Sequence, residues 1–91
     1  MSQTAKHIIF SGRVQGVGFR FTAFNIANRY GLAGFVRNVY NGTVEMLVQG
    51  PADTVDNCIR DIGEEFGRFV TETKIEEAAF DLKYKDFKIT F

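Results

Sequence analysis

Residues 34–49 read GFVRNVYNGTVEMLVQ and contain two apolar segments that an Asn-Gly pair at 41–42 separates. Asn-Gly is the dipeptide that best tolerates the positive φ angles of a type I′ turn, so the stretch predicts a β-hairpin. The return strand alternates, with Val44, Met46 and Val48 on one face and polar residues on the other. We therefore expect a half-buried sheet at this point of the chain.

A helix is predicted on each side of this hairpin. The first, over residues 21–30, carries an apolar stripe at near-helical spacing, and Gly31 is a natural stop for it. That stripe consists of Phe21, Phe24, Ala27 and Tyr30. The second helix begins at Gly50-Pro51, with Pro in its first turn, and ends at Gly67. Its stripe consists of Val55, Cys58, Ile59, Ile62 and Phe66, and both stripes predict packing against one core.

Three further strands complete the pattern, over residues 7–11, 73–82 and 86–91. The expected inward side chains of the last two strands are Ala78, Phe80 and Leu82, then Phe87, Ile89 and Phe91. The order of elements is strand, helix, strand, strand, helix, strand, with a strand added at the end. This order predicts an α+β fold of the ferredoxin-like, split βαβ type, with both helices on one face of a mostly antiparallel sheet. We expect a single domain over residues 1–91.

The composition restricts the classes of partner. The chain has 91 residues, 45% of them hydrophobic, which is enough for a small core. Lys and Arg together number 11, as do Asp and Glu, whereas nucleic-acid binders usually carry a basic surplus. The sequence contains no apolar run long enough to indicate a membrane span or a signal peptide. Cys58 is the only cysteine and has no internal partner, so we expect a reducing, cytoplasmic compartment.

The connection between the first strand and the first helix, residues 12–20, reads GRVQGVGFR. Its glycine spacing fits neither the dinucleotide fingerprint nor the P-loop, so we expect no nucleotide cofactor. Gly16 and Gly18 permit a tight bend, or curl, of the backbone that points consecutive N–H groups at one anion. Arg20 adds a planar guanidinium group that can donate two hydrogen bonds to the same anion. A glycine-containing connection with a solvated Arg is the more common alternative when composition alone is considered.

Two longer motifs resemble the signatures of a known family, the acylphosphatases. Residues 12–20 resemble the first signature, G-x-V-Q-G-V-x-F-R, and residues 34–45 resemble the second, G-[WF]-V-x-N-x-x-[DN]-G-x-V-E. Residues 49–51 and 84–89 also look like the family, so the resemblance covers essentially the whole chain. Phe35 stands where Trp is common and Asn41 where Asp is common, which keeps a ring and a turn residue at these places.

The resemblance implies a hydrolase that cleaves the carboxyl–phosphate anhydride of acyl phosphates by direct attack of water. It implies no metal, no cofactor and no covalent intermediate. Arg20 is then expected to bind the phosphate and Asn38 to position the water. The phosphate would also be bound by the backbone N–H groups of Gln15, Gly16, Val17, Gly18, Phe19 and Arg20. Gly16 is the glycine we expect the curl to need, since Gly18 fills a position that the family leaves variable.

The expected partners follow from this activity. They are a small-molecule acyl phosphate and inorganic phosphate, the latter as product and inhibitor, with neither nucleic acid nor membrane, and the chain is expected to be a monomer. The leaving carboxylate is a weak base, with a pKa around 4, and needs little proton donation. Residues 12–20 contain no nucleophile, so phosphomonoesters are expected to be weak substrates.

Two other function classes stay open at the level of the sequence. One is a non-catalytic, phosphate-binding module with an acylphosphatase-like fold, such as the domain at the N-terminus of the hydrogenase-maturation carbamoyltransferases. The other is an RNA-recognition domain, which shares the order of elements, but residues 31–38 lack its basic and aromatic signature. Among single residues, His7 is expected on a solvent face or sheet edge, and Cys58 in the core. Thr43 either supports Asn38 or acts as a cross-strand β-former.

Overall fold

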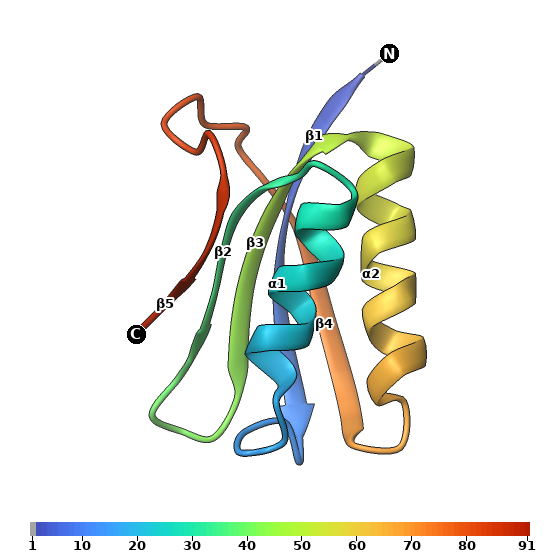
Figure 1. Cartoon of the computed structure of the whole chain (residues 1–91), viewed down its shortest axis with the longest axis vertical. Helices are drawn as coiled ribbons and strands as arrows, with labels where there is room; N and C mark the ends of the chain where they lie inside the picture. The colour runs from blue at the N-terminus through green and yellow to red at the C-terminus, as the bar shows by residue number, and fades with distance from the viewer. Residues whose placement is uncertain (1) are drawn as a thin grey trace.

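The computed structural model describes residues 2–91, which form a five-stranded sheet with two helices on one face (Figure 1). The elements are β1 (Gln3–Gly12), α1 (Phe19–Arg29), β2 (Ala33–Asn38), β3 (Val44–Pro51), α2 (Ala52–Phe66), β4 (Val70–Ala78) and β5 (Phe87–Thr90). The strands lie in the order β4-β1-β3-β2-β5, and only the β2–β5 pair is parallel. The predicted ferredoxin-like α+β architecture is confirmed.

The core lies between the helices and one face of the sheet. Val44, Met46 and Val48 are fully buried in it, as the alternation of the return strand predicted. The stripe of α2 faces the same core, with Val55, Cys58, Ile62 and Phe66 buried. The ring of Phe19 contacts Phe10 on β1 and Phe66 on α2, with centroids 4.8 Å and 4.5 Å away. These contacts fix the start of α1 against the sheet and the second helix.

Helix α1 begins at Phe19, two residues earlier than predicted, and this changes which face is buried. Its buried residues are Phe19, Ala23, Ile26 and Ala27. Phe21 lies about 200° around the helix from Phe19, and 63% of it is exposed. The prediction of Phe21 in the core stripe was therefore wrong. The predicted stop is correct, since the N–H groups of Gly31 and Leu32 return to the last helical turn.

The β2–β3 connection is a hairpin as predicted, but its turn is not type I′. The N–H of Gly42 donates to the carbonyl of Val39, so Tyr40 and Asn41 are the central residues of the turn. Gly42 has a positive φ of 94°, whereas no non-glycine residue described has one. The Asn41 side chain instead accepts hydrogen bonds from the N–H and hydroxyl of Thr43, which closes the loop with Asn41 at negative φ.

Strand β4 ends at Ala78, not at residue 82 as predicted. It is an edge strand, and its pairing with β1 stops at the Ala5–Ala78 pair. The chain then leaves for the opposite edge of the sheet, so Phe80 and Leu82 are 42% and 78% exposed and not inward. The buried Gln49 side chain holds this crossing segment, because it exchanges two hydrogen bonds with the backbone of Asp81.

Strand β5 is shorter than predicted and pairs in parallel with β2. Phe87 is buried as expected, but Phe91 lies beyond the strand and is 96% exposed, so its inward placement was wrong.

Pro51 was predicted within the first turn of α2. It instead precedes the helix as its N-cap residue. Neither helix among residues 2–91 has the length and apolar character needed to cross a bilayer.

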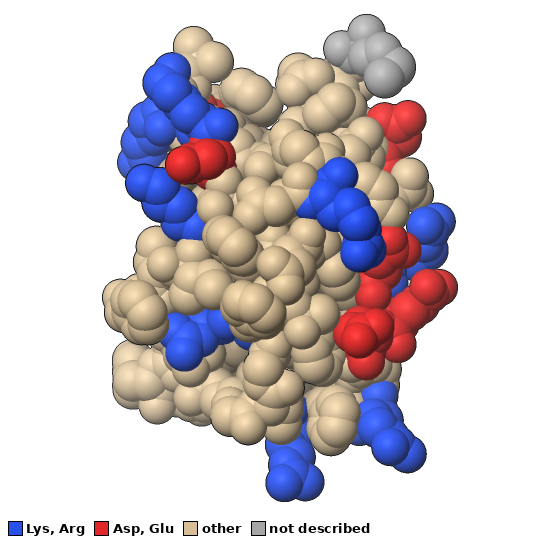
Figure 2. All heavy atoms as spheres, viewed as in Figure 1, with Lys and Arg blue, Asp and Glu red and all other residues tan. Residues whose placement is uncertain are grey.

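Charge is unevenly distributed on the helix-covered face (Figure 2). Acidic side chains gather along the α2 side, where the helix carries Asp61, Glu64 and Glu65. Basic side chains gather on the opposite side, over the segment that leads into β5. The carboxylates of α2 therefore lie on the far side of this face from β5.

Candidate active site

The C-terminal ends of three strands and the start of one helix meet at one end of the sheet. β1 and β2 both run antiparallel to β3, and β5 runs parallel to β2, so β1, β2 and β5 all terminate at this end (Figure 1). A pocket of about 300 Å³ opens there. Its lining includes Gly16, Gly18, Arg20 and Asn38. Four predicted site residues, three from the first motif and Asn38 from the second, thus line the same pocket.

The backbone of the loop before α1 presents unused hydrogen-bond donors. Within residues 2–91, the N–H groups of residues 14–18 donate to no backbone or side-chain acceptor. The N-cap residue of helix α1 is Gly18, which provides no side-chain cap, and the first turn of the helix contains no acidic residue. The first N–H groups of a helix are unpaired and carry partial positive charge. The loop and helix start therefore present unpaired donors of the kind that bind anions at helix N-termini.

Two glycines give this loop its curl. Gly16 and Gly18 have φ angles of 79° and 78°, in the region that side-chain-bearing residues rarely adopt. A Cβ at either position would meet no atom within 4 Å, so the cost of a substitution is backbone strain alone. The two φ angles do not support ranking Gly16 above Gly18, because both residues adopt the same conformation.

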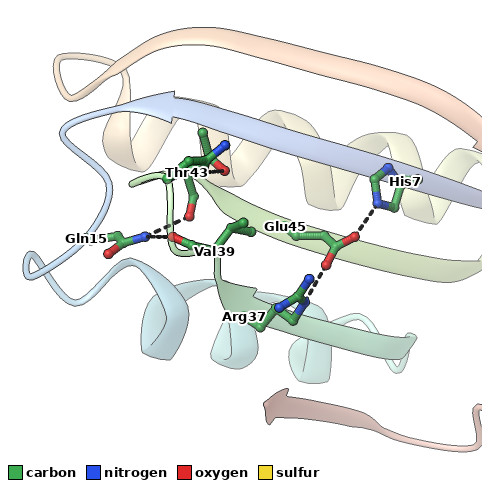
Figure 3. Close-up of polar contacts among 7 residues, drawn as sticks. His7, Gln15, Arg37, Val39, Thr43 and Glu45 are labelled. Carbon is green, nitrogen blue, oxygen red and sulfur yellow. Dashed lines mark hydrogen bonds and ion pairs between the residues drawn. The ribbon is translucent and has the colours of Figure 1, made fainter. Parts of the chain in front are cut away.

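The side chain of Gln15 ties the loop to the β2–β3 turn (Figure 3). Its Nε2 donates to the carbonyl oxygens of Val39 and Thr43, each at 2.8 Å. This amide nitrogen is occupied, so the backbone N–H is the donor that Gln15 can offer to a ligand. Thr43 takes part through its carbonyl, while its hydroxyl donates to Asn41 and not to Asn38.

Arg20 lies in the first turn of α1 and projects into the pocket lining. Its guanidinium carbon is 5.2 Å from the ring centroid of Phe91, a cation–π contact. Within residues 2–91, no carboxylate oxygen lies within 4 Å of its nitrogen atoms. The positive charge of Arg20 is therefore available to an anion in the pocket.

Asn38 is the last residue of β2 and pairs with Val44 across the hairpin. Its Oδ1 atom is buried and has no hydrogen-bond donor among the described residues. A buried acceptor without a donor costs about 1–3 kcal/mol, so folded proteins rarely keep one without a reason. Asn38 lines the pocket, and its Oδ1 has an unused capacity to accept a hydrogen bond.

A second polar cluster lies on the strands, outside the pocket lining (Figure 3). Glu45 on β3 accepts from Arg37 on β2, and its other oxygen lies 2.7 Å from Nε2 of His7 on β1. Burial raises the pKa of Glu45, but the hydrogen bonds from His7 and Arg37 outweigh it and hold that pKa below its ordinary value. His7 is on an interior strand and not at a sheet edge, but its side chain is 33% exposed and lies on the face opposite the buried Ile8, so of the two expected placements the solvent face fits. No cluster of three metal-ligating side chains occurs between residues 2 and 91.

Four apolar residues of the pocket were missed as site residues at the level of sequence: Val14, Phe21, Ile89 and Phe91. The sequence patterns placed the last three in the core. One signal was present for Phe21, because Phe19 and Phe21 cannot share one helix face. The position of Phe91 depends on where β5 ends, which the pattern of residues 86–91 did not indicate.

Comparison with known proteins gives one consistent family. A family model described as acylphosphatase matches residues 6–89. A curated protein of Chlorobaculum tepidum named acylphosphatase is 41% identical over 90 residues, which cover 98% of each chain. Another acylphosphatase, from Acidiphilium cryptum, is 55% identical over 56 residues, or 62% of each chain.

Solved structures agree with these sequences. The crystal structure of acylphosphatase from Bacillus subtilis superposes with a TM-score of 0.86 and 29% identity, covering 99% of this chain and 100% of that one. Full-length HypF in the phosphate- and nucleotide-bound form gives a TM-score of 0.82 and 32% identity, over 99% of this chain but only 12% of that one. The likeness to proteins named acylphosphatase along their full length does not favour the non-catalytic module.

Proposed function

Because the chain belongs to the acylphosphatase family and is an acylphosphatase, we propose that its pocket binds the phosphate of an acyl phosphate and directs water at it. In this proposal Arg20 and the loop amides hold the phosphate, and Asn38 positions the water. The observation that carries it is the convergence of unpaired N–H donors, an uncompensated guanidinium and an orphaned amide oxygen in one pocket.

The phosphate is held chiefly by the backbone. The N–H groups of residues 15–20 would donate to its oxygens, and the N-terminus of α1 favours its negative charge. Arg20 adds two parallel hydrogen bonds to two oxygens of the same phosphate. The hydrogen bonds from Gln15 to Val39 and Thr43 support this arrangement, because they hold the loop in place before the ligand arrives.

The attack is a single displacement. Oδ1 of Asn38 accepts a hydrogen bond from water and leaves a lone pair of that water facing phosphorus. The water oxygen bonds to phosphorus as the bond from phosphorus to the bridging oxygen breaks, and the electron pair departs with the carboxylate. The proton of the water passes to an oxygen of the phosphate itself, so no separate general base is required.

Positioning and charge stabilisation suffice for this reaction. Phosphoryl transfer proceeds through a loose transition state whose charge spreads over the equatorial oxygens. A preorganised donor aimed at such charge is worth about 3 kcal/mol or somewhat more. Phosphomonoesters have poorer leaving groups and are expected to react weakly at this site. We further propose that the enzyme acts as a monomer in the cytoplasm, where the thiol of Cys58 stays reduced.

The test is steady-state hydrolysis of benzoyl phosphate by the wild type and by Arg20→Ala. We expect turnover, competitive inhibition by inorganic phosphate, and no effect of a chelator. Arg20→Ala should lose most of its turnover, while Arg29→Ala, on the exposed last turn of the same helix, should keep it. Phosphate binding by a wild type that hydrolyses no acyl phosphate would contradict the proposal and favour the non-catalytic module.

A further inference from the structure

The lining of the pocket comprises a polar group of residues, here called the polar end, and an apolar group, here called the apolar end. The polar end consists of the loop, Arg20 and Asn38, as described above. The apolar end is lined by Phe21 from α1, Ile89 from β5 and Phe91 after β5. Arg20 has the only charged side chain in the lining that the structure describes. A ligand that fits both ends therefore carries an anionic group joined to an uncharged, apolar one.

The two phenylalanines of the apolar end are exposed to an unusual degree. Phe21 is 63% and Phe91 96% exposed, whereas the rings of Phe10 and Phe19 are buried. Ile89, which lines the same pocket, is partly buried and packs against the core. Covering a large aromatic ring with apolar surface lowers the free energy of the system. The apolar end is thus a surface that a ligand can cover.

The spacing of the two ends matches one molecule. The guanidinium of Arg20 lies 5.2 Å from the ring centroid of Phe91, so a phosphate on Arg20 has this ring as its neighbour. In an acyl phosphate, only the bridging oxygen and the carbonyl carbon separate phosphorus from the acyl substituent. A substituent that points away from the loop then contacts the rings.

We propose that Phe21, Ile89 and Phe91 form the acyl-binding wall of the active site and select acyl phosphates with aromatic or extended apolar acyl groups. This inference rests on the proposed placement of the phosphate at Arg20. Small acyl groups, such as acetyl, cannot reach far along the wall and gain little from it. Acyl groups that carry a second negative charge find no cationic partner there.

The experiment has a binding arm and a turnover arm. Benzoylphosphonate and acetylphosphonate, which are non-hydrolysable analogues, are titrated by calorimetry, and benzoyl and acetyl phosphate are assayed for kcat and KM. The variants are Phe21→Ala, Phe91→Ala and Phe91→Leu, whose exposed positions leave the core intact. Leu82→Ala is the matched control, because Leu82 is 78% exposed, a fraction between those of Phe21 and Phe91, but lies outside the pocket.

We expect each Phe→Ala change to weaken benzoylphosphonate binding and to raise KM for benzoyl phosphate by about fivefold, the value of one aromatic contact. Acetyl compounds and inorganic phosphate should change less than about twofold, since they miss the wall. The benzoylphosphonate affinity of Phe91→Leu and its KM for benzoyl phosphate should lie between those of the wild type and Phe91→Ala. Because ratios between variant and wild type are compared, the intrinsic reactivity of each substrate cancels.

Two results would overturn the inference. Equal losses of affinity for the benzoyl compounds, the acetyl compounds and inorganic phosphate in Phe91→Ala would show that Phe91 acts only through Arg20. An unchanged ratio of benzoyl to acetyl affinity in both Phe→Ala variants would show that the rings contact no acyl group. Failure of the proposed function is distinct from either, because benzoylphosphonate would still bind preferentially at the wall while the wild type hydrolysed neither acyl phosphate.

Discussion

The side-chain amide of Gln15 donates to the carbonyl oxygen of Val39 at 2.8 Å, and so joins the loop after β1 to the turn after β2. The same nitrogen donates to Thr43 on the other side of the turn. Val39 directly follows Asn38, so this one amide ties the proposed phosphate-binding loop to the strand end that carries Asn38. The two signature motifs are therefore connected by a side chain, not only by the sheet.

Replacing Gln15 by Leu should lower kcat/KM for benzoyl phosphate about tenfold, because a small displacement of positioned groups is costly in rate. The carbonyls of Val39 and Thr43 would each keep a backbone donor but lose the hydrogen bond from Gln15. The loss of two hydrogen bonds lowers the free energy of unfolding by about 1–2 kcal/mol. Enzyme kinetics and urea titration measure the two effects. Gln3→Leu, on an exposed part of β1, is the control for polarity loss. Full activity in Gln15→Leu would show that the loop holds its shape without this amide.

Replacing Arg20 by Lys keeps the charge but removes the planar fork. We expect kcat/KM to fall about 100-fold, within the range measured for removal of one transition-state donor. Inorganic phosphate should bind more weakly as well, since the ground state also uses the fork. Arg29→Lys is the matched variant on the same helix. Retention of most of the turnover in Arg20→Lys would refute the bidentate role.

Asn38→Ala separates water positioning from phosphate binding. We expect kcat to fall about 100-fold, while the inhibition constant of inorganic phosphate stays within about twofold, because Asn38 touches the water and not the phosphate in this mechanism. The variant also removes the buried, unpartnered Oδ1, so the midpoint of thermal unfolding should not fall. Asn25→Ala, on the exposed face of α1, controls for amide loss. Equal losses in turnover and phosphate affinity would contradict the assignment.

Local patterns predicted the architecture because they record which faces are buried. The alternation around Met46 and the stripe containing Cys58 both gave correct core faces, since each lies wholly within one element. The pattern failed where an element's end decides the face. Phe21 lies in the first turn of α1 and Leu82 lies beyond the end of β4. Near these positions the chain is held by tertiary contacts of Phe19 and Gln49, which local patterns do not reveal.

The candidate site was predictable to a similar degree. The motifs identified Arg20 and Asn38, and the structure brings both into one pocket. The bond from Gln15 to Val39 was not predictable, because it joins residues 24 positions apart through a turn of a type that the Asn-Gly pair did not indicate. The apolar wall was hidden for the same reason, since its members come from α1 and from the chain after β5.

Cys58 should be inert to thiol reagents in the folded protein. Burial raises the pKa of its thiol to about 12, and the charge of Asp61 adds to the shift, so the reactive thiolate is scarce at pH 8. Ellman's reagent should give no colour with native protein and one equivalent in denaturant. Asp56→Cys in a Cys58→Ala background places an exposed thiol on the same helix and should react at once. Rapid reaction of native Cys58 would show that α2 opens readily.

The Glu45 cluster should make part of the protein's stability dependent on pH. The folded-state pKa of Glu45 lies below its ordinary value of 4.5, since the hydrogen bonds from His7 and Arg37 outweigh the opposing effect of burial. A carboxyl with a lowered pKa binds protons more readily when unfolded. Its stabilisation is therefore complete above pH 4.5 and is lost as the pH falls through the folded-state pKa.

Glu45→Gln should accordingly lower the free energy of unfolding by about 1–2 kcal/mol at pH 7, because charge-assisted hydrogen bonds are replaced by neutral ones. The difference between wild type and variant should shrink as the pH falls below 4.5, the ordinary value. Urea titrations at a series of pH values measure it. Glu65→Gln, on the exposed end of α2, should show almost no difference at any pH. A gap that stayed constant down to low pH would mean that packing, and not the charge of Glu45, stabilises the three strands.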